Sequence, residues 1–330
     1  MPFAARAWLR AWPLAIALGV LASCSASSPI TTLRVGTIDS IDELPLFVIQ
    51  EQRLDRKYGL HLKTSGQGAG ARIIEALAEG SLDAGWAVGT VPLLIAAEAG
   101  IVPQRVVAVA TNAFADSDRP GIGVVVTPMV FGWRDLNGSL IATYAPSSLG
   151  GAAITVQLRR EGIQGYRFVQ IALPNLGLAL ASGLVTAAAM PEPFLTQSLQ
   201  RGDGKLLGWV IGGPPLERMV YAALAVRAQL YREQREAVYG LLRAHLDAVQ
   251  WINANPERAR SIVARRLGIT DELGRQISLL RWPLDGRYDP QLFTTMQDIL
   301  VEASLLRAPI PAPQIFDTTA LEAVLKDRVQ

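Results

Sequence analysis

The chain of 330 residues contains one cysteine, Cys24, and two histidines, His61 and His245. A single cysteine has no partner for a disulfide within the chain. The two histidines are far apart in the sequence, one in an expected strand and one in an expected helix, and they form no zinc-ligand pattern. We therefore expect no metal site, no catalytic residue and no enzymatic activity.

Charged residues are also scarce, at 18% of the chain, whereas half of the residues are apolar. This composition is typical of a globular α/β protein with a large core, and the length allows one large domain or two lobes. The formal net charge is +2, and Arg6 and Arg10 near the N-terminus supply two of the positive charges. The remainder is close to neutral and offers no basic surface for nucleic acid.

The N-terminal 29 residues differ from the rest of the chain. Arg6 and Arg10 precede an apolar run at residues 13–22. Its last two residues begin the segment Leu-Ala-Ser-Cys at 21–24. A basic start, a short apolar run and small residues are typical of a secretory signal, and the run is too short to span a bilayer. The segment Leu-Ala-Ser-Cys resembles the lipobox of bacterial lipoproteins, whose cysteine becomes acylated.

The leader thus predicts a signal peptide at 1–23, a tether at 24–31, and attachment in the periplasm or cell envelope to a membrane by a lipid on Cys24. The alternative is an ordinary cleaved signal in which Cys24 has no role.

Apolar segments of strand and helix length alternate through the chain. Strands are expected at 32–37, 60–64, 82–88 and 106–111, with helices between them, and the same alternation resumes from 122 to 211. This pattern predicts an α/β fold with mostly parallel sheets flanked by helices. From residue 219 to the end we expect a helical C-terminal segment.

Two breaks in the pattern, at 112–119 and 212–215, indicate that the chain crosses between two lobes and returns. We expect lobe 1 at 32–113 and 219–330, lobe 2 at 114–218, and a hinge near 115–119 and 212–217. A partial repeat supports two similar αβ units: Ala76, Leu77 and Gly80 recur at a constant offset as Ala179, Leu180 and Gly183.

Ligands of open α/β sheets bind beyond the carboxyl ends of the strands. This rule selects the following candidate ligand-binding residues: Asp39, Ser40, Gln67, Gly68, Trp86, Gly89, Thr90, Tyr144, Ser147, Ser148 and Glu192. Each has a structural alternative. Trp86 could pack in the core, Ser147 and Ser148 could cap a helix, and Glu192 could be an acid favoured by a helix dipole. We interpret Asp42 and Glu43 as capping residues only.

Residues 66–71 fit the G-x-G-x-x-A pattern of a dinucleotide-binding turn. Such a site also requires an acidic residue at the end of the next strand, where this chain has Val88, Gly89 and Thr90. We therefore expect no nucleotide cofactor. The glycines still expose amides at a helix N-terminus, which suit a polar or anionic group.

Several short segments are similar, in order and spacing, to the nitrate/sulfonate/taurine-type periplasmic binding proteins of ABC importers. They lie at 33–37, 76–85, 89–92, 135–138, 189–193 and 251–259, so the resemblance covers about residues 32–268. It implies a type II periplasmic-binding fold in a monomer, whose two lobes close on a small solute and deliver it to an ABC permease with its ATPase. The chain departs from the family at Thr186, where an aspartate is usual, and lacks a tryptophan beside Glu192.

Charge at the expected strand ends bears on the solute. Asp39 and Glu192 lie at such ends, whereas Arg72 is the one basic residue nearby. We expect a neutral or nitrogenous cationic solute rather than nitrate or a sulfonate, although helix amides alone can hold an anion. Two other functions use the same features: an enzyme resembling those of pyrimidine synthesis in thiamine pathways, and a sensory or scaffold lipoprotein with a degenerate cleft.

Overall fold

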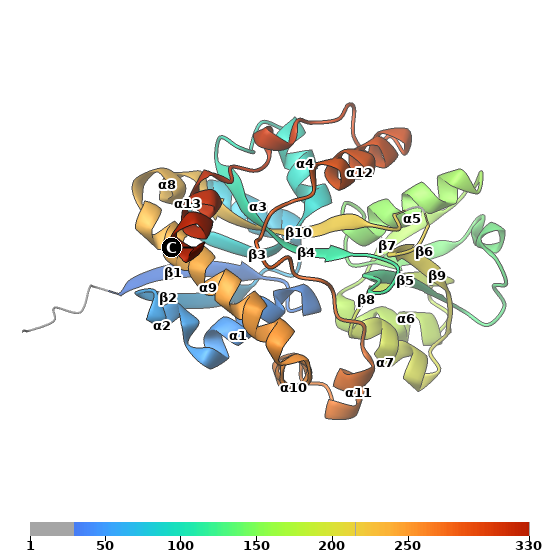
Figure 1. The fold of residues 1–330 in the computed structure, drawn as a ribbon. Coiled ribbons are helices and arrows are strands. Elements are labelled where there is room, and N and C mark those ends of the chain that lie inside the picture. Colours follow the sequence, from blue (N-terminus) through green and yellow to red (C-terminus); the bar gives the residue numbers. More distant parts are fainter. Residues whose placement is uncertain (1–29, 215, 330) are drawn as a thin grey trace, which may run out of the picture.

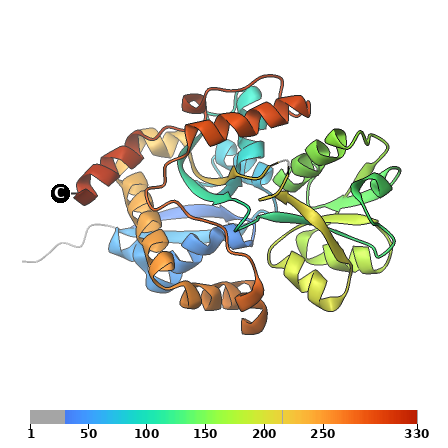
Figure 2. The ribbon, with the colours of Figure 1, turned by 45° about the vertical axis from the view of Figure 1, so that its right-hand side comes forward.

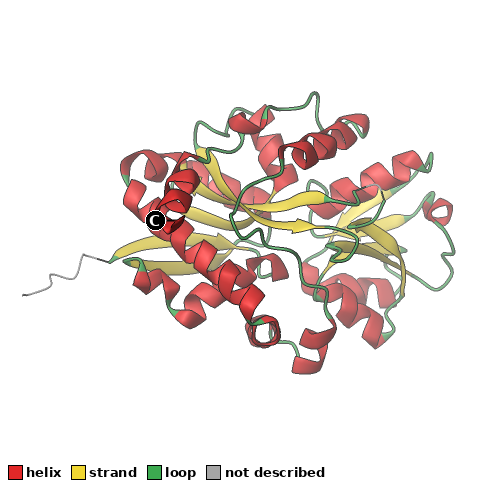
Figure 3. Ribbon diagram, in the orientation of Figure 1, coloured by secondary structure: helices red, strands yellow, loops and turns green. Residues whose placement is uncertain are grey.

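A computed structural model describes residues 30–214 and 216–329, which form two five-stranded sheets flanked by helices (Figures 1 and 3). The first sheet has the order β2-β1-β3-β10-β4. Its strands are β1 (Thr31–Thr37), β2 (Leu60–Gly66), β3 (Ala84–Gly89), β4 (Val106–Ala115) and β10 (Met219–Arg227). β1 pairs in parallel with β2 and β3, and β10 runs antiparallel to β3 and β4. We call this sheet and its helices the first lobe.

The helices of the first lobe come from both ends of the chain. They are η1 (Ile41–Glu43), α1 (Leu44–Gln52), α2 (Leu54–Lys57), α3 (Gly70–Glu79), α4 (Thr90–Glu98), α8 (Ala228–Glu233), α9 (Arg235–Ala254), α10 (Pro256–Leu267), α11 (Asp271–Gln276), α12 (Pro290–Glu302), η4 (Ala312–Gln314) and α13 (Thr319–Val329). The expected helix after β1 is split at Arg53, which is left-handed with φ 54°. Gly80, with φ 81°, ends α3 in the left-handed conformation that glycine adopts readily.

The second sheet has the order β7-β6-β8-β5-β9 and forms the second lobe. Its strands are β5 (Ile122–Val126), β6 (Leu140–Thr143), β7 (Arg167–Gln170), β8 (Ala187–Pro191) and β9 (Lys205–Ile211). Its helices are η2 (Trp133–Leu136), α5 (Leu149–Arg160), η3 (Leu173–Asn175), α6 (Leu176–Ala181) and α7 (Phe194–Arg201). Figure 1 shows α5 on one side of this sheet and α6 and α7 on the other.

The α/β fold with two sheets is confirmed. Four of the five strands in each sheet run in the same direction, whereas β10 in the first sheet and β5 in the second run antiparallel to both neighbours. The expectation for the start of the C-terminal segment is wrong. Residues 219–227, expected to begin the helical C-terminal segment, form β10 between β3 and β4. This run is almost wholly apolar and buried, as is typical of a central strand covered on both faces.

The chain passes from the first sheet to the second after β4 and returns after β9. The residue boundaries of the two lobes and of the hinge remain predictions. Among residues 30–214 and 216–329, no helix is both long enough and apolar enough to span a membrane. The expected signal peptide and Cys24 lie outside the described residues.

Candidate functional site

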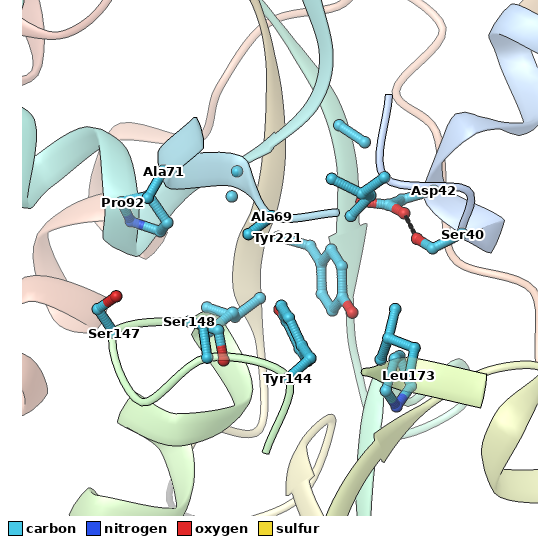
Figure 4. Close-up of a pocket in the computed structure, with 17 residues that line it drawn as sticks. Ser40, Asp42, Ala69, Ala71, Pro92, Tyr144, Ser147, Ser148, Leu173 and Tyr221 are labelled. Atoms are coloured by element: carbon cyan, nitrogen blue, oxygen red, sulfur yellow. Dashed lines mark hydrogen bonds between the residues drawn. The ribbon is translucent and has the colours of Figure 1, made fainter. Parts of the chain in front are cut away.

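A cavity lies between the two lobes, at the end of the first sheet where β1 and β3 finish (Figure 4). The first lobe lines it with the turn after β1, the start of α3, the turn before α4, and Tyr221 of β10. The second lobe adds the turn from β6 into α5, together with Leu173 and Pro191. Its volume is about 30 Å³, which is room for on the order of two water molecules or a chemical group of similar size.

Asp42 is the one carboxyl group among the described residues that line this cavity, and no lysine, arginine or histidine lines it with Asp42. The residue is only 2% exposed. Its carboxylate accepts a hydrogen bond from the Ser40 hydroxyl, as Figure 4 shows. Burial raises the pKa of Asp42 to about 6, although the Ser40 hydrogen bond opposes the shift. At neutral pH the cavity therefore contains a carboxylate that no basic side chain neutralises.

The backbone around Asp42 is held by neighbouring side chains. Asn112 Nδ2 donates to the Asp42 carbonyl oxygen at 2.7 Å. The buried Glu43 carboxylate accepts the backbone amides of Ile38 at 2.6 Å and Asp39 at 3.1 Å. Burial raises the pKa of Glu43 well above its usual value, and the Asp42 charge adds to the shift. Glu43 thus fixes the turn that presents Ser40 and Asp42 to the cavity.

Two tyrosines face the cavity from opposite lobes, Tyr144 after β6 and Tyr221 in β10 (Figure 4). Burial raises the pKa of Tyr144 to about 12 and that of Tyr221 well above its usual value. Both hydroxyls therefore remain protonated and can donate at neutral pH. Gly121 leaves room for the Tyr221 ring, because a Cβ at residue 121 would lie 2.5 Å from the ring.

The second lobe contributes the N-terminus of α5. Ser148 caps this helix, since its Oγ accepts the Gly151 amide at 3.2 Å, and it also lines the cavity. The capping and ligand-binding interpretations of Ser148 are thus compatible. Gly151 permits the tight turn, because a Cβ there would lie 2.2 Å from the Pro146 carbonyl oxygen. The exposed Ser147 lines the cavity as well.

Three helices, α3, α4 and α5, begin at this cavity. Their first amides and the positive ends of their dipoles favour a group with negative charge or an acceptor oxygen. The cavity therefore offers both kinds of interaction: donors at the helix starts and on the tyrosine and serine hydroxyls, and an acceptor at Asp42.

The structure brings some of the sequence-selected residues together at the cavity. Five of them line it: Ser40, Gly89, Tyr144, Ser147 and Ser148. Three others line a wider hollow of about 690 Å³ that shares Tyr144 and Leu173 with the cavity; they are Asp39, Gln67 and Gly68. We call this hollow the vestibule.

The other three selected residues, Trp86, Thr90 and Glu192, are not among the residues that line the cavity or the vestibule. Trp86 is fully buried against His245, with 5.7 Å between ring centroids. The Thr90 hydroxyl donates to the Val220 carbonyl at 2.6 Å. The structure thus places these two side chains within the first lobe.

Glu192 joins the two lobes. Its carboxylate accepts the Thr196 hydroxyl at 2.7 Å and the Thr196 amide at 3.2 Å, at the start of α7. It also accepts the Ser278 amide at 3.3 Å, from the segment after α11. Burial raises its pKa, and these hydrogen bonds oppose the shift.

Sequence reasoning missed Asp42 and Tyr221 as cavity residues. Asp42 was interpreted as a capping residue, although it follows the selected Ser40 by only two residues in the same segment after β1. Tyr221 was missed because 219–227 was not predicted as a strand, and its unbroken apolar character was the available signal. Among the described residues, no cluster of His, Cys, Asp and Glu could hold a metal ion.

Solved structures of several binding proteins have a similar fold. The alkanesulfonate-binding protein SsuA from Xanthomonas axonopodis pv. citri, bound to MOPS, superposes with TM-score 0.71 at 18% identity, covering 88% of this chain and 99% of its own. The periplasmic nitrate-binding protein NrtA from Synechocystis PCC 6803 superposes with TM-score 0.75 at 16% identity, covering 90% of this chain and 89% of its own. These likenesses establish the fold.

An additional neighbour is a mutant of DSZB in complex with biphenyl-2-sulfinic acid, with TM-score 0.65 at 17% identity, covering 90% of this chain and 99% of its own. No curated protein matches the sequence. Residues 26–268, well over half of the chain, match the NMT1-like family. The chain belongs to the NMT1-like family.

Proposed function

We propose that the protein is an extracytoplasmic solute-binding protein that captures a small polar organic solute between its lobes and delivers it to an ABC permease with its ATPase. The observation that carries this proposal is the cavity between the lobes, which backbone amides, hydroxyls and one buried carboxylate line. The structural neighbours SsuA and NrtA are binding proteins for alkanesulfonate and nitrate, respectively. The leader sequence supports a location in the cell envelope with an anchor through a lipid on Cys24, and the resemblance to periplasmic binding proteins implies a monomer.

The proposed solute carries a hydrogen-bond donor, as a neutral or cationic nitrogen group does. Asp42 needs such a donor, because its carboxylate is buried and no basic side chain lines the cavity with it. The hydroxyls of Tyr144, Tyr221 and Ser147 and the helix starts suit an acceptor atom on the same solute. A compact anion such as nitrate would lie close to the Asp42 carboxylate, and their repulsion would oppose binding.

Closure of the lobes would exclude water from this cavity and strengthen its polar contacts. Polar contacts outside the cavity join the lobes: Glu192 with Ser278, Gln200 Nε2 with Gln276 Oε1 at 2.6 Å, and the Arg160–Glu302 ion pair at 3.0 Å. Figure 2 shows α12, which carries Glu302, extending towards α5 of the second lobe. Opening about the proposed hinge at 115–119 and 212–217 would break these contacts.

An enzyme is the competing function, because DSZB shares the fold. The arrangement of side chains favours binding. His61 pairs with Arg56 on the surface at 2.9 Å, and burial lowers the pKa of His245 to about 4 within the core. Neither histidine lines the cavity, so Ser147, Ser148 and the tyrosines have no histidine base beside them.

A melting-temperature screen of the mature protein tests the proposal. A solute that binds only the folded state raises the melting temperature as its concentration increases. We expect amines, amidines or pyrimidines to do so, and nitrate and alkanesulfonates not to. A shift with sulfonates alone would contradict the proposed solute chemistry. A screen in which no solute shifts the melting temperature would favour a sensory or scaffold lipoprotein. Turnover of a compound that does bind would instead establish an enzyme.

A further inference from the structure

The vestibule is continuous in its lining with the cavity and much larger, about 690 Å³ against about 30 Å³. Ile38, Ala69, Tyr144 and Leu173 line both spaces. A cavity of this size accommodates only a small group of the solute. The rest of a larger solute would extend past Tyr144 and Leu173 into the vestibule, so the lining of the vestibule bears on the solute's identity.

The polar lining of the vestibule comes from both lobes and differs from that of the cavity. Its members are Asp39, Gln67, Arg72, Gln170, Gln197 and Arg266. Two arginines and one aspartate give a formal charge of +1, whereas Asp42 is the only ionisable carboxyl among the described residues that line the cavity. The glutamine amides add uncharged donors. The two adjoining spaces thus have opposite electrostatic character.

Neither arginine forms an ion pair with a carboxylate among the described residues. Arg266 donates to the Gln50 amide oxygen and lies over the Phe47 ring, 4.9 Å from its centroid. These uncharged partners position the guanidinium and leave its charge uncompensated. Arg72 is exposed in the first turn of α3, a turn without acidic residues. A cation there is opposed by the helix dipole, so the two together create a site attractive to an anion.

We propose that the vestibule is a second subsite, in which Arg72 and Arg266 bind an acidic group of the solute while its nitrogen group contacts Asp42 in the cavity. The inference rests on the proposed function and narrows its solute class to two-ended molecules, with a donor at one end and a carboxylate or similar acid at the other. A guanidinium binds such acids through charge-assisted hydrogen bonds. Asp39 sets the orientation, because it repels an acid placed at its side of the vestibule.

Matched probe pairs test the inference. The probes are n-alkylamines and the ω-amino acids that carry the same carbon chain and a terminal carboxylate, titrated by calorimetry at pH 8. We expect one chain length at which the amino acid binds at least about tenfold more tightly than its alkylamine. The double variant Arg72→Gln/Arg266→Gln is expected to remove this advantage and to leave alkylamine affinity unchanged. Arg105→Gln, an exposed arginine outside the vestibule, is the matched control and is expected to keep the advantage.

Three results would overturn the subsite: equal affinity within every pair, equal loss for both series in the double variant, or no binding of either series. The solute screen of the wild-type protein separates this failure from failure of the proposed function. If an amine, amidine or pyrimidine raises the melting temperature while the amino acid and alkylamine of every matched pair bind with equal affinity, the binding function stands and the second subsite is refuted. Absence of any binding solute would refute both.

Discussion

Asp42 and Glu192 are buried carboxyl groups in turns of opposite lobes, and they differ in their hydrogen-bond partners. They are 2% and 3% exposed, and burial raises the pKa of each. Glu192 accepts three hydrogen bonds, from the Thr196 amide and hydroxyl and from the Ser278 amide. Asp42 accepts one from another described residue, the Ser40 hydroxyl. One carboxylate is satisfied by the protein, and the other is left short of donors.

This difference separates a structural acid from a binding acid. A buried acceptor with several partners in the chain has a structural role, since its hydrogen bonds offset part of its desolvation. An acceptor that lacks partners reduces stability until a ligand supplies a donor. From the sequence, Glu192 was predicted to contact the ligand and Asp42 to cap a helix. The hydrogen-bond partners of the two carboxylates instead favour Asp42 as the ligand contact.

The largest expected effect comes from Asp42→Asn. We expect this variant to lose about 100-fold in affinity for a nitrogenous solute, because a buried charged partner is removed. At pH 8 the free protein should become more stable by up to about 3 kcal/mol, since the folded-state pKa of about 6 exceeds the ordinary aspartate pKa of 3.8. Calorimetry and thermal unfolding measure the two effects, and Asp298→Asn, at an exposed position outside the cavity and the vestibule, is the control. A variant that binds normally would remove Asp42 from the site.

The free energy of unfolding should depend on pH through the ionisation of Asp42. Between about pH 4 and 6 the unfolded chain has released the Asp42 proton and the folded chain retains it, because its folded pKa is raised to about 6. This group therefore destabilises the folded state progressively as pH rises through that window, and its penalty is constant above it. The wild-type and Asp42→Asn unfolding energies should converge near pH 4 and diverge by pH 7. Parallel curves would show that the Asp42 pKa is not raised.

Affinity should change over the same window. A cationic solute prefers the ionised carboxylate, so its binding should weaken about tenfold for each pH unit below 6. Calorimetric titrations between pH 5 and 8 measure this slope. An affinity that stays constant over the range would indicate a neutral solute or a contact away from Asp42.

The alternation of apolar segments predicted most of the fold, because burial imposes a period on each strand and helix. The exception, β10, has no period: Ala222, Ala223 and Ala225 are buried on both faces of the sheet. Such a run cannot be assigned by period alone. Tyr221 reaches the cavity only because this strand inserts antiparallel between β3 and β4, a long-range pairing that local sequence does not encode.

The candidate site was predictable to the level of loops and not of side chains. The strand-end rule selected the turn after β1, and Ser40 of this turn lines the cavity. Within that turn, Asp39 has a positive φ of 57° and is exposed, while Asp42 three residues later is buried beside the cavity. Which carboxylate faces the solute depends on this local backbone conformation. Trp86 similarly lies in a selected strand, but its ring packs against His245 in the core.

Glu192→Gln should have a smaller effect than Asp42→Asn and the opposite sign on stability. Glutamine keeps one acceptor oxygen and turns a donor towards the Thr196 amide, so we expect a loss of about 1 kcal/mol in unfolding free energy. Solute affinity should fall only about threefold, through weaker closure at Ser278. Chemical denaturation and calorimetry measure both values. A loss of affinity as large as that of Asp42→Asn would restore Glu192 to the ligand contacts.

Arg160→Gln should give the smallest effect. It measures how much a surface ion pair between the lobes contributes to the free energy of closure. The Arg160–Glu302 pair joins α5 to α12 across the lobes, but its side chains are 40% and 60% exposed. An exposed ion pair contributes about 0.5 kcal/mol or less, and salt screens it further. We therefore expect an affinity change of less than about twofold at physiological salt, with the difference from wild type vanishing at high salt. Calorimetry at two salt concentrations makes the measurement. A larger, salt-sensitive loss would mean that charge pairs at the lobe surfaces, rather than the buried Glu192–Ser278 contact and the bound solute, hold the lobes together.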